Sequence, residues 1–438
     1  MDQKQGGPVQ AQMRAETGAL VTEASTAEDE TEPRVDETTP RVIVIHNGAL
    51  RGYAIPAAFA RAGMLERFYT DMCAGRGVGR VAQWGKHLPV IGPKLSRLAY
   101  RRPPPEVLAK TRTFDLTTAK GLIGEARTGS HHALLLARHA QWRRHGTRLC
   151  RLGFGRATHV FSVYGLGGPY LQHAKSAGLK VICDVNIAPS AGEIMRAEFD
   201  RSPGWEATPW STLDPGLREE MQETADLFIC PSDFVRQDVI ATLGIPAEKT
   251  ALVPYAVADK WFELETTPIP GRVLFVGQVS LRKGAHTLVD AAQQLRGRGR
   301  RYEFRFAGQA SPHFLANPAC EGLSFLQRVP REDIAAEFAR ADVLVLPSLA
   351  EGSAGVTYEA LGAGVPVITT HEAGSVVRDG IDGLIVPSRD GGALAHAVER
   401  VVEDRALRTR MAAAARQRAQ EFTWPRYAER LIEAVRRV

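Results

Sequence analysis

The chain has 438 residues, of which 44% are hydrophobic and 24% charged, and its net charge is +6. These values are typical of a soluble globular protein and exclude a mainly disordered or fibrous chain. We find no apolar run of the roughly 18 residues that a membrane span needs, and we expect no secretory signal. Five Cys without CxxC spacing disfavour a disulfide framework and a zinc site, and they fit a reducing cytoplasm.

Charge is distributed unevenly along the chain. Residues 1–40 hold nine acidic and three basic side chains, a single Leu and no aromatic residue, so we predict a disordered acidic tail. Residues 76–158 hold 17 Lys and Arg against three acidic residues. A basic surface of that size attracts anionic lipid or an acidic polymer, although an ordinary solvated face is the alternative. No nucleic-acid module accompanies the charge, so we expect no nucleic-acid partner.

Strands and helices alternate after the tail. Residues 41–46 form an apolar, β-branched run that predicts a buried parallel strand. A short helix is expected at 53–63 and a second strand at 67–70. The basic stretch contains Pro103–Pro105, which no helix or central strand accepts, and it is predicted to be helical at 131–149. Further strands are expected at 158–163, 179–183, 226–230 and 251–253.

A second set of strands follows a linker at 263–271, which contains two Pro and no periodicity. Its strands are expected at 272–276, 303–307, 324–327, 343–346, 365–369 and 384–386. The two alternating sets predict an α/β protein with two doubly wound, Rossmann-like domains that face a central cleft. Such sheets bind ligands at the carboxyl ends of their strands, so functional residues are expected in the loops that follow the strands.

The loop after residues 272–276 carries a candidate diphosphate site. Gly277 lets the backbone approach a ligand. Arg282 and Lys283 stand at the start of the next helix, where the helix dipole favours an anion. The loop is neither a Walker loop nor a GxGxxG turn, and an ordinary strand–helix loop with exposed bases is the alternative.

The loop after residues 343–346 carries a second group of candidates. Its small residues let backbone N–H groups face an anion at a helix N-terminus; they are Gly352, Ser353, Ala354 and Gly355. Glu359, about one turn into the following helix, is placed to accept hydrogen bonds from a ribose diol. Glu351, before the loop, is placed to reach sugar hydroxyls in the same pocket.

With these loops, the chain resembles the retaining, nucleotide-sugar-dependent glycosyltransferases of family 4, which have the GT-B fold. The resemblance covers residues 41–438 and is strongest from Cys230 onward. The matching segments are Pro231–Asp238, Val253–Val257, Gly277–Gly284, Phe306–Gly308, Ala341–Ser348, Glu351–Leu361, Gly364–Ile368, Asp382–Pro387 and Phe422–Trp424. Because their order and spacing also match, a chance origin is disfavoured.

The resemblance implies roles for individual residues. Lys283 and Arg282 would bind the donor diphosphate, Glu359 would hold the ribose, and Glu351 would act at the transferred sugar. The remaining donor contacts would come from Gly48, Gly277, Gly352, Ser353, Ala354, Gly355, Val356 and Thr357. The co-substrate would be a nucleotide-diphosphate sugar. No metal or other cofactor is implied, because positive side chains and helix N-termini neutralise the leaving group.

The resemblance also implies a domain division and a setting. An acceptor domain at 41–262 would precede a donor domain at 271–423, and a final helix at 424–438 would cross back to the acceptor domain. The expected acceptor is a glycan, a lipid-linked sugar or another molecule, as in cell-envelope or exopolysaccharide synthesis. We expect a cytoplasmic enzyme, with a peripheral contact between residues 76–158 and the inner face of the cell membrane as an option.

Departures from the family pattern leave alternatives open. Gln278 stands where the family often has Arg, and the first domain has no clear match to the family's active-site His. Asp184, near that position, is the candidate catalytic residue alongside Glu351. Its alternatives are Asn186, His46 and Tyr164. Two other functions also stay open: a nucleotide-sugar 2-epimerase-like enzyme on the same fold, and a non-catalytic protein that binds sugar nucleotides.

Overall fold

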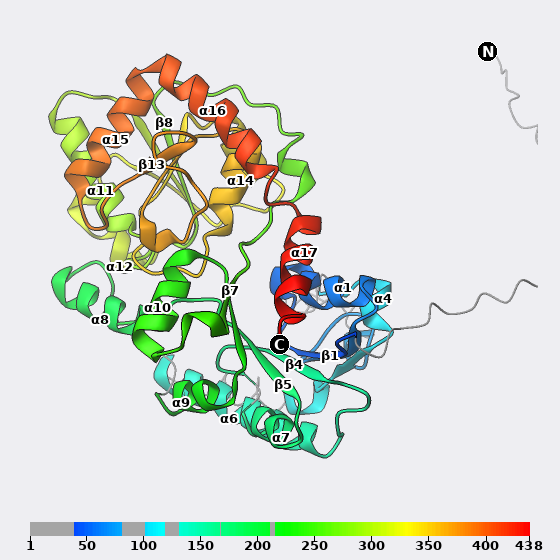
Figure 1. Cartoon of the computed structure of the whole chain (residues 1–438). Helices are drawn as coiled ribbons and strands as arrows, with labels where there is room; N and C mark the ends of the chain where they lie inside the picture. The colour runs from blue at the N-terminus through cyan, green and yellow to red at the C-terminus, as the bar shows by residue number, and fades with distance from the viewer. Residues whose placement is uncertain (1–38, 81–100, 119–130, 167, 211–214) are drawn as a thin grey trace, which may run out of the picture. The chain divides into compact units, whose positions relative to one another are not determined.

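The computed structural model describes residues 39–80, 101–118, 131–166, 168–210 and 215–438. Within these residues lie two parallel β-sheets, of seven and six strands, and the helices that connect their strands (Figure 1). The predicted fold class, an α/β protein with two doubly wound sheets, is therefore confirmed.

The first sheet has the strand order β3-β2-β1-β4-β5-β6-β7. Its strands are β1 (Val42–Ile45), β2 (Leu65–Thr70), β3 (Thr111–Thr113), β4 (His159–Val163), β5 (Lys180–Asp184), β6 (Leu227–Cys230) and β7 (Thr250–Leu252). Strands β1, β4 and β6 bury every residue, which is why their sequences show no alternation of apolar and polar side chains. The order reverses between β1 and β4, and this is the switch point of the sheet.

The second sheet has the order β10-β9-β8-β11-β12-β13. Its strands are β8 (Arg272–Val276), β9 (Glu303–Ala307), β10 (Ser324–Gln327), β11 (Val343–Leu346), β12 (Val367–Thr369) and β13 (Gly383–Ile385). Here the order reverses between β8 and β11, which pair in parallel through Val273 and Val343. The loops after these two strands hold most of the sequence-predicted site residues.

Helices connect the strands in both domains. Those of the first part of the chain are η1 (Leu50–Tyr53), α1 (Ala54–Arg61), α4 (Pro105–Leu108), α6 (His131–Cys150), α7 (Pro169–Ser176), α8 (Ala191–Arg201), α9 (Pro215–Thr224), α10 (Asp233–Leu243), η2 (Ala247–Lys249) and η3 (Asp259–Trp261). Those of the second part are α11 (Ala285–Gly297), α12 (Pro312–Leu315), η4 (Pro318–Cys320), α13 (Ile334–Arg340), α14 (Gly355–Ala363), η5 (His371–Ala373), α15 (Gly391–Glu403), α16 (Arg405–Ala419) and α17 (Trp424–Val435).

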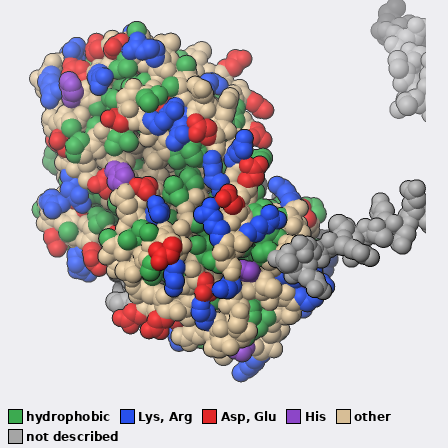
Figure 2. Space-filling view, viewed as in Figure 1, with side chains coloured by type: hydrophobic (Ala, Val, Ile, Leu, Met, Phe, Trp, Pro, Cys, Tyr) green, Lys and Arg blue, Asp and Glu red, His purple; other side chains and the backbone are tan. Residues whose placement is uncertain are grey.

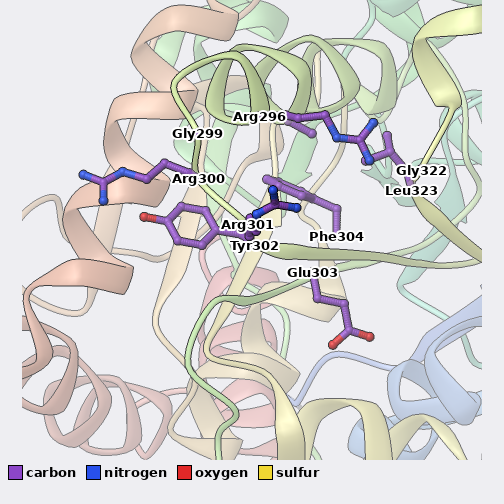
Figure 3. A pocket seen from close by; sticks show the side chains of 10 residues that line it. Arg296, Gly299, Arg300, Arg301, Tyr302, Glu303, Phe304, Gly322 and Leu323 are labelled. Atoms are coloured by element: carbon purple, nitrogen blue, oxygen red, sulfur yellow. The ribbon is translucent and has the colours of Figure 1, made fainter.

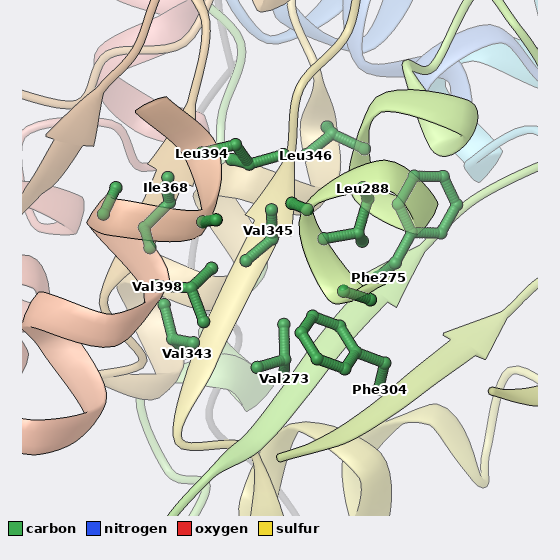
Figure 4. Packing of buried hydrophobic residues seen from close by; sticks show 14 of the residues in the cluster. Val273, Phe275, Leu288, Phe304, Val343, Val345, Leu346, Ile368, Leu394 and Val398 are labelled. Carbon is green, nitrogen blue, oxygen red and sulfur yellow. The ribbon is translucent and has the colours of Figure 1, made fainter. Parts of the chain in front are cut away.

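The core of the second domain lies between its sheet and helices α11 and α15 (Figure 4). Leu288 of α11 packs there with Leu394 and Val398 of α15, against Val273 of β8 and Val345 of β11. These five side chains are at most 1% exposed. Because burying one such side chain contributes about 1.5–3 kcal/mol, this layer holds the loops after β8 and β11 on a rigid base.

Helix α17 packs against the first sheet although it follows the second in sequence. Its apolar residues Tyr427, Leu431 and Val435 recur every four positions, so they share one helix face. This face packs in the same core cluster as Val42 and Val44 of β1. In Figure 1, α17 lies beside α1, with which it is in contact.

The strands expected from the sequence are observed, with ends that differ by at most two residues. The sequence missed β3, which has only three residues, Thr111–Thr113, and pairs with β2 alone at the sheet edge. A polar strand this short is below the length at which alternation can be recognised. The expected helix at 131–149 corresponds to α6.

Much of the basic stretch at 76–158 lies outside the described residues, namely 81–100 and 119–130. Within the described part, Arg101 pairs with Asp71 and Arg143 pairs with Glu220. Figure 2 shows one face of the molecule, on which Lys and Arg side chains are interspersed with Asp and Glu. Among the helices of the described segments, none combines the length and the apolarity that a membrane crossing requires.

Candidate functional site

Gly277 and Lys283 pack together in the loop after β8. Gly277 has a φ of 140°, a conformation that favours glycine. A Cβ at this position would lie 3.6 Å from Lys283 Cε, so the lysine side chain runs across the glycine. Burial lowers the pKa of the Lys283 ammonium, and the nearby Glu351 carboxylate opposes that shift.

The Glu351 carboxylate joins this loop to the loop after β11. Its Oε1 lies 2.7 Å from Lys283 Nζ and 2.5 Å from Arg282 Nη1. The Arg282 guanidinium also donates to the Ala350 carbonyl at 3.1 Å. The structure therefore brings three sequence-predicted residues together at the switch point of the second sheet, where such sheets bind ligands. We call Arg282, Lys283 and Glu351 the Glu351 cluster.

The Glu351 cluster has a net positive charge because two cations share one carboxylate. The side chains of Arg282, Lys283 and Glu351 are 23%, 14% and 11% exposed. Solvent and salt therefore screen the excess charge less than they would at an open surface. A diphosphate has enough oxygens to satisfy both cations at once, so the cluster suits that anion.

The main chain at Gly352 lies against loops of the first domain. A Cβ on Gly352 would be 2.0 Å from the carbonyl oxygen of Asn186, which follows β5. The Ser232 hydroxyl, which follows β6, donates to the Gly352 carbonyl at 2.5 Å. Only a residue without a side chain fits here. Loops at the carboxyl ends of both sheets thus meet at Gly352.

Ser353 and Ala354 are engaged by protein groups. The Ala354 N–H donates to the Ala373 carbonyl at 3.0 Å. The Ser353 hydroxyl donates to the Gly374 carbonyl at 2.7 Å and lies 2.9 Å from the Tyr358 hydroxyl. The sequence-based expectation that the whole small-residue loop faces an anion is therefore not met at the Ala354 N–H.

The first turn of α14 holds the remaining loop candidates. Gly355 is exposed and Val356 is half-buried, and both stand at the helix start, where N–H groups have no acceptor within the helix. Thr357 is buried, and its hydroxyl donates to the Ala354 carbonyl at 2.7 Å. Thr357 therefore caps the turn, and the N–H groups that suit an anion are those of Gly355 and Val356.

Glu359 lies on α14, one turn after Gly355, and is half-buried. Burial raises the pKa of its carboxyl, and the positive charges of Arg331 and Lys260 oppose this rise. Across the described part of the chain, no protein group donates a hydrogen bond to this carboxylate. Glu359 is thus open to an external donor, but it is not in contact with the Glu351 cluster.

Gly48 follows β1 and has a φ of 58°. Its N–H donates to Asp71 Oδ1 at 2.8 Å, and Arg101 pairs with the other carboxylate oxygen at 3.2 Å. A Cβ on Gly48 would lie 3.5 Å from the guanidinium carbon of Arg101. Gly48 therefore sits beneath Arg101 with its N–H occupied, and the sequence did not point to either charged neighbour.

Asp184 ends β5 and is bound by Arg51. Arg51 Nη1 lies 2.8 Å from Asp184 Oδ2, and the two side chains are 7% and 1% exposed. The same guanidinium donates to the hydroxyls of Tyr255, at 2.8 Å, and Tyr427, at 3.3 Å. This network ties the first sheet to α17. The sequence missed Arg51, whose φ of 47° in the loop after β1 no pattern indicates.

The three alternatives to Asp184 lie at strand ends of the same sheet. His46 follows β1 and is 1% exposed, and burial lowers its pKa to about 4, so its ring is neutral at pH 7. Asn186 follows β5, where its carbonyl faces Gly352. Tyr164 follows β4 and is buried. Asn186 therefore lies against the second domain's candidate loop.

A further contact between the domains centres on Glu198 of α8, which is 1% exposed. Its carboxylate lies 2.9 Å from His286 Nε2 on α11 and 2.5 Å from Arg389 Nε. Burial alone would raise the pKa of Glu198, but hydrogen bonds from His286 and Arg389 outweigh it and lower the pKa to about 2. No sequence pattern pointed to this contact.

The two doubly wound parallel sheets are the architecture of the GT-B fold, and the cationic cluster lies at the switch point of the second sheet. Residues 270–404, which contain the whole Glu351 cluster, match the family of Glycosyl transferases group 1.

Named relatives share part of the chain. A D-inositol 3-phosphate glycosyltransferase from Corynebacterium urealyticum is 31% identical over 246 residues, or 50% of this chain and 58% of that protein. A glycogen synthase from Mycobacterium tuberculosis is 27% identical over 293 residues, or 64% of this chain and 70% of that protein. The chain thus spans 58% to 70% of the length of these two relatives.

Solved structures share the fold over most of the chain. A sucrose-phosphate synthase from Thermosynechococcus elongatus has a TM-score of 0.64 at 18% identity, covering 91% of this chain and 98% of that one. Anabaena HepE, in complex with UDP and glucose, has a TM-score of 0.57 at 15% identity, covering 90% and 99%. At such identities these likenesses show the fold alone.

Proposed function

We propose that the protein transfers a sugar from a nucleotide-diphosphate sugar to an acceptor. The observation that carries this function is the Glu351 cluster, a partly buried cationic site within the residues that match the group 1 family. Arg282 and Lys283 bind the donor diphosphate, Glu359 accepts from the ribose, and Glu351 meets the sugar. Anabaena HepE, which shares the fold, was solved with UDP-glucose, and this supports a donor of that class.

The reaction that fits these groups is a metal-independent transfer with retention of configuration. The bond between the anomeric carbon and the diphosphate breaks, the acceptor oxygen bonds to that carbon, and the acceptor proton passes to the leaving phosphate oxygen. The protein's part is to stabilise the departing charge with Arg282, Lys283 and the N–H groups at the start of α14. Activity unchanged by a chelator, and a product with the donor's anomeric configuration, are the expected results.

The binding test compares nucleotide diphosphates by the melting temperature of the purified protein. A ligand that binds the folded state raises this temperature by mass action. We expect one of UDP, GDP or ADP to raise it, and Lys283→Ala to abolish the rise. The matched control is Lys249→Ala, at an exposed lysine of η2. If none of the three diphosphates stabilises the protein, the proposed donor site is wrong.

A turnover measurement distinguishes an enzyme from a non-catalytic protein that binds sugar nucleotides. The departures from the family pattern, at Gln278 and at the active-site His, are compatible with either. The measurement is release of the free nucleotide diphosphate from the sugar nucleotide whose base was identified by melting. We expect slow hydrolysis without an acceptor and faster release with one. Binding without release under both conditions contradicts a transferase. Conversion of the sugar to its 2-epimer, detected by NMR, contradicts it in favour of an epimerase.

We further propose that the basic stretch at 76–158 holds the enzyme at an anionic membrane surface that carries the acceptor. Support comes from α6, which exposes Arg144 and Arg148 one turn apart. A base near an anionic membrane contributes about 1 kcal/mol, which salt screens. We expect salt-sensitive sedimentation with anionic liposomes that Arg144→Glu with Arg148→Glu weakens. Equal sedimentation with neutral liposomes contradicts the proposal.

The matched control for the membrane test changes the same net charge elsewhere. Arg328→Glu with Arg410→Glu alters two exposed arginines of the second domain. We expect this variant to sediment with anionic liposomes as the unmodified protein does. An equal loss in both variants would attribute the binding to net charge rather than to the face of α6.

A further inference from the structure

A cavity of about 510 Å³ lies at the end of the second sheet where its strands begin (Figure 3). It is bounded by the last turn of α11, the loop from Gly299 to Tyr302, the start of β9, and Leu323 just before β10. The Glu351 cluster lies in the loops after β8 and β11, at the opposite edge of the same sheet, and the two sites share no residue. The volume is within the roughly 300–1,000 Å³ of small-molecule sites.

The cavity lining carries an excess of positive charge. Its charged residues are Arg296, Arg300, Arg301 and Glu303. The Glu303 carboxylate is already bound by Arg272 and Arg305, each at 2.8 Å, and it points away from the lining arginines in Figure 3. Glu303 therefore neutralises none of the arginines that face the cavity.

Two of the three arginines have no carboxylate partner among the described residues. Arg300 lies 2.6 Å from a Glu399 oxygen and 3.5 Å from a Glu403 oxygen, and it extends away from the other two in Figure 3. Arg296 and Arg301 form no ion pair with any residue that the structure describes. The cavity thus presents two guanidinium groups whose charge no neighbour balances.

The Arg296 guanidinium contacts the backbone opposite it. Its Nη1 donates to the Glu321 carbonyl at 3.0 Å. A Cβ at Gly322, where φ is 76°, would lie 1.9 Å from its Nη2, so the guanidinium packs against this glycine. The Tyr302 hydroxyl donates to Glu403, which fixes a second wall of the cavity. A ligand therefore meets a guanidinium that is already bonded to a backbone carbonyl and a ring whose hydroxyl is bonded to Glu403.

We propose that this cavity binds a phosphorylated monosaccharide, with its phosphate between Arg296 and Arg301. A guanidinium pairs with phosphate through two parallel hydrogen bonds, and two unpaired guanidiniums match the charge of one phosphate monoester. The Tyr302 ring and the Leu323 side chain supply apolar surface for the CH groups of a sugar ring. This site is separate from the donor site and does not depend on the proposed transfer reaction.

The test is calorimetric titration of the full chain with glucose 6-phosphate as the probe. We expect binding at concentrations up to about 10 mM, and we expect Arg296→Gln and Arg301→Gln each to weaken it about tenfold or more. Both arginines are exposed, so the variants should fold, which circular dichroism checks. The matched control is Arg298→Gln, an exposed arginine next to this loop that does not line the cavity.

Further titrations determine which site the sugar phosphate occupies and which chemical groups of the ligand are recognised. Lys283→Ala should keep full affinity for glucose 6-phosphate; if it abolishes binding, the sugar phosphate occupies the donor site and the proposal fails. Glucose should not bind, because the phosphate supplies the charge. Inorganic phosphate binding as tightly as glucose 6-phosphate would overturn the assignment to a sugar. Absence of glucose 6-phosphate binding, or equal binding by Arg301→Gln and the unmodified protein, would overturn the site itself.

Discussion

Each sheet has a group of carboxylate and cationic side chains at the end of a strand. The two groups differ in how completely the protein itself balances their charge. In the first domain, Asp184 pairs with Arg51, both nearly fully buried, and two tyrosine hydroxyls accept further hydrogen bonds from the Nη atoms of the guanidinium. In the second domain, one Glu351 oxygen is shared by Arg282 and Lys283. The first group is neutral and closed, whereas the second keeps an unbalanced positive charge.

The balance of charge therefore distinguishes a structural ion pair from a candidate ligand site. A buried charge that is paired with an equal and opposite charge needs no further counterion. A site with more cations than carboxylates, partly open to solvent, is stabilised when an anion arrives. By this criterion we propose the Glu351 cluster as the donor site, and we propose that Asp184 acts as a positioning residue for Arg51, which also donates to Tyr427 of α17.

The largest expected effect is on stability, from Asp184→Asn. Removing one partner of a buried pair leaves the Arg51 charge uncompensated, which costs about 3–5 kcal/mol of unfolding free energy. Chemical denaturation at pH 7 measures this loss. Activity per folded molecule should fall little. Unchanged stability with lost activity would instead make Asp184 the catalytic residue that the sequence suggested.

The next effect is on catalysis, from Lys283→Ala. Loss of one positive group from the site of the departing diphosphate is expected to lower kcat/KM by about 10²–10³-fold. Stability should change less than in Asp184→Asn, because Arg282 still pairs with Glu351. Steady-state kinetics and denaturation of the same preparation measure the expected changes in kcat/KM and in stability. Equal kcat/KM values in Lys283→Ala and the Lys249→Ala control would contradict a role of the Glu351 cluster in the reaction.

The sequence predicted the second domain well because its signals are local. Its strands are buried apolar runs, and each candidate residue lies a few positions from a strand end. Arg282 and Lys283 follow β8, and Glu351 follows β11, so parallel pairing of neighbouring strands was enough to bring them together. The same reasoning placed Glu359 on the following helix without indicating which charges act on it.

The sequence failed where contacts depend on distant residues. Arg51 reaches Asp184, 133 positions away, and Tyr427, 376 positions away, through a left-handed backbone turn that its neighbours do not encode. Glu198 likewise contacts His286, 88 positions away, and Arg389, 191 positions away. Such contacts follow from the tertiary arrangement rather than from periodicity or spacing.

A smaller effect is expected at the Glu198 contact between the domains. Hydrogen bonds lower the pKa of this carboxyl from 4.5 to about 2, so its contribution is present above pH 4.5 and is lost as pH falls toward 2. Glu198→Gln should reduce the unfolding free energy by about 2–3 kcal/mol at pH 7 and much less near pH 2.5. Denaturant titrations at both pH values test this. A constant difference across pH would mean that the carboxylate charge contributes nothing.

The smallest effect on stability is expected from Glu359→Gln. It is a gain in stability, whereas the other substitutions are expected to reduce stability. Burial raises the pKa of this carboxyl, so its charged form destabilises the folded protein at neutral pH. Glu359→Gln removes the charge and should raise the unfolding free energy by less than about 1 kcal/mol at pH 7. This gain should vanish as pH falls and the carboxyl becomes protonated in the unmodified protein.

The same substitution should weaken the nucleotide diphosphate found by melting about tenfold, because an amide is a poorer acceptor for a ribose diol than a carboxylate. Higher stability with lower affinity distinguishes a carboxylate kept for a ligand from one kept for the fold, such as Asp184. Denaturation and calorimetric titration of Glu359→Gln measure the two quantities separately. Lower stability with unchanged affinity would mean that Glu359 stabilises the fold and does not bind the nucleotide. The proposed donor site would then consist of the Glu351 cluster without Glu359.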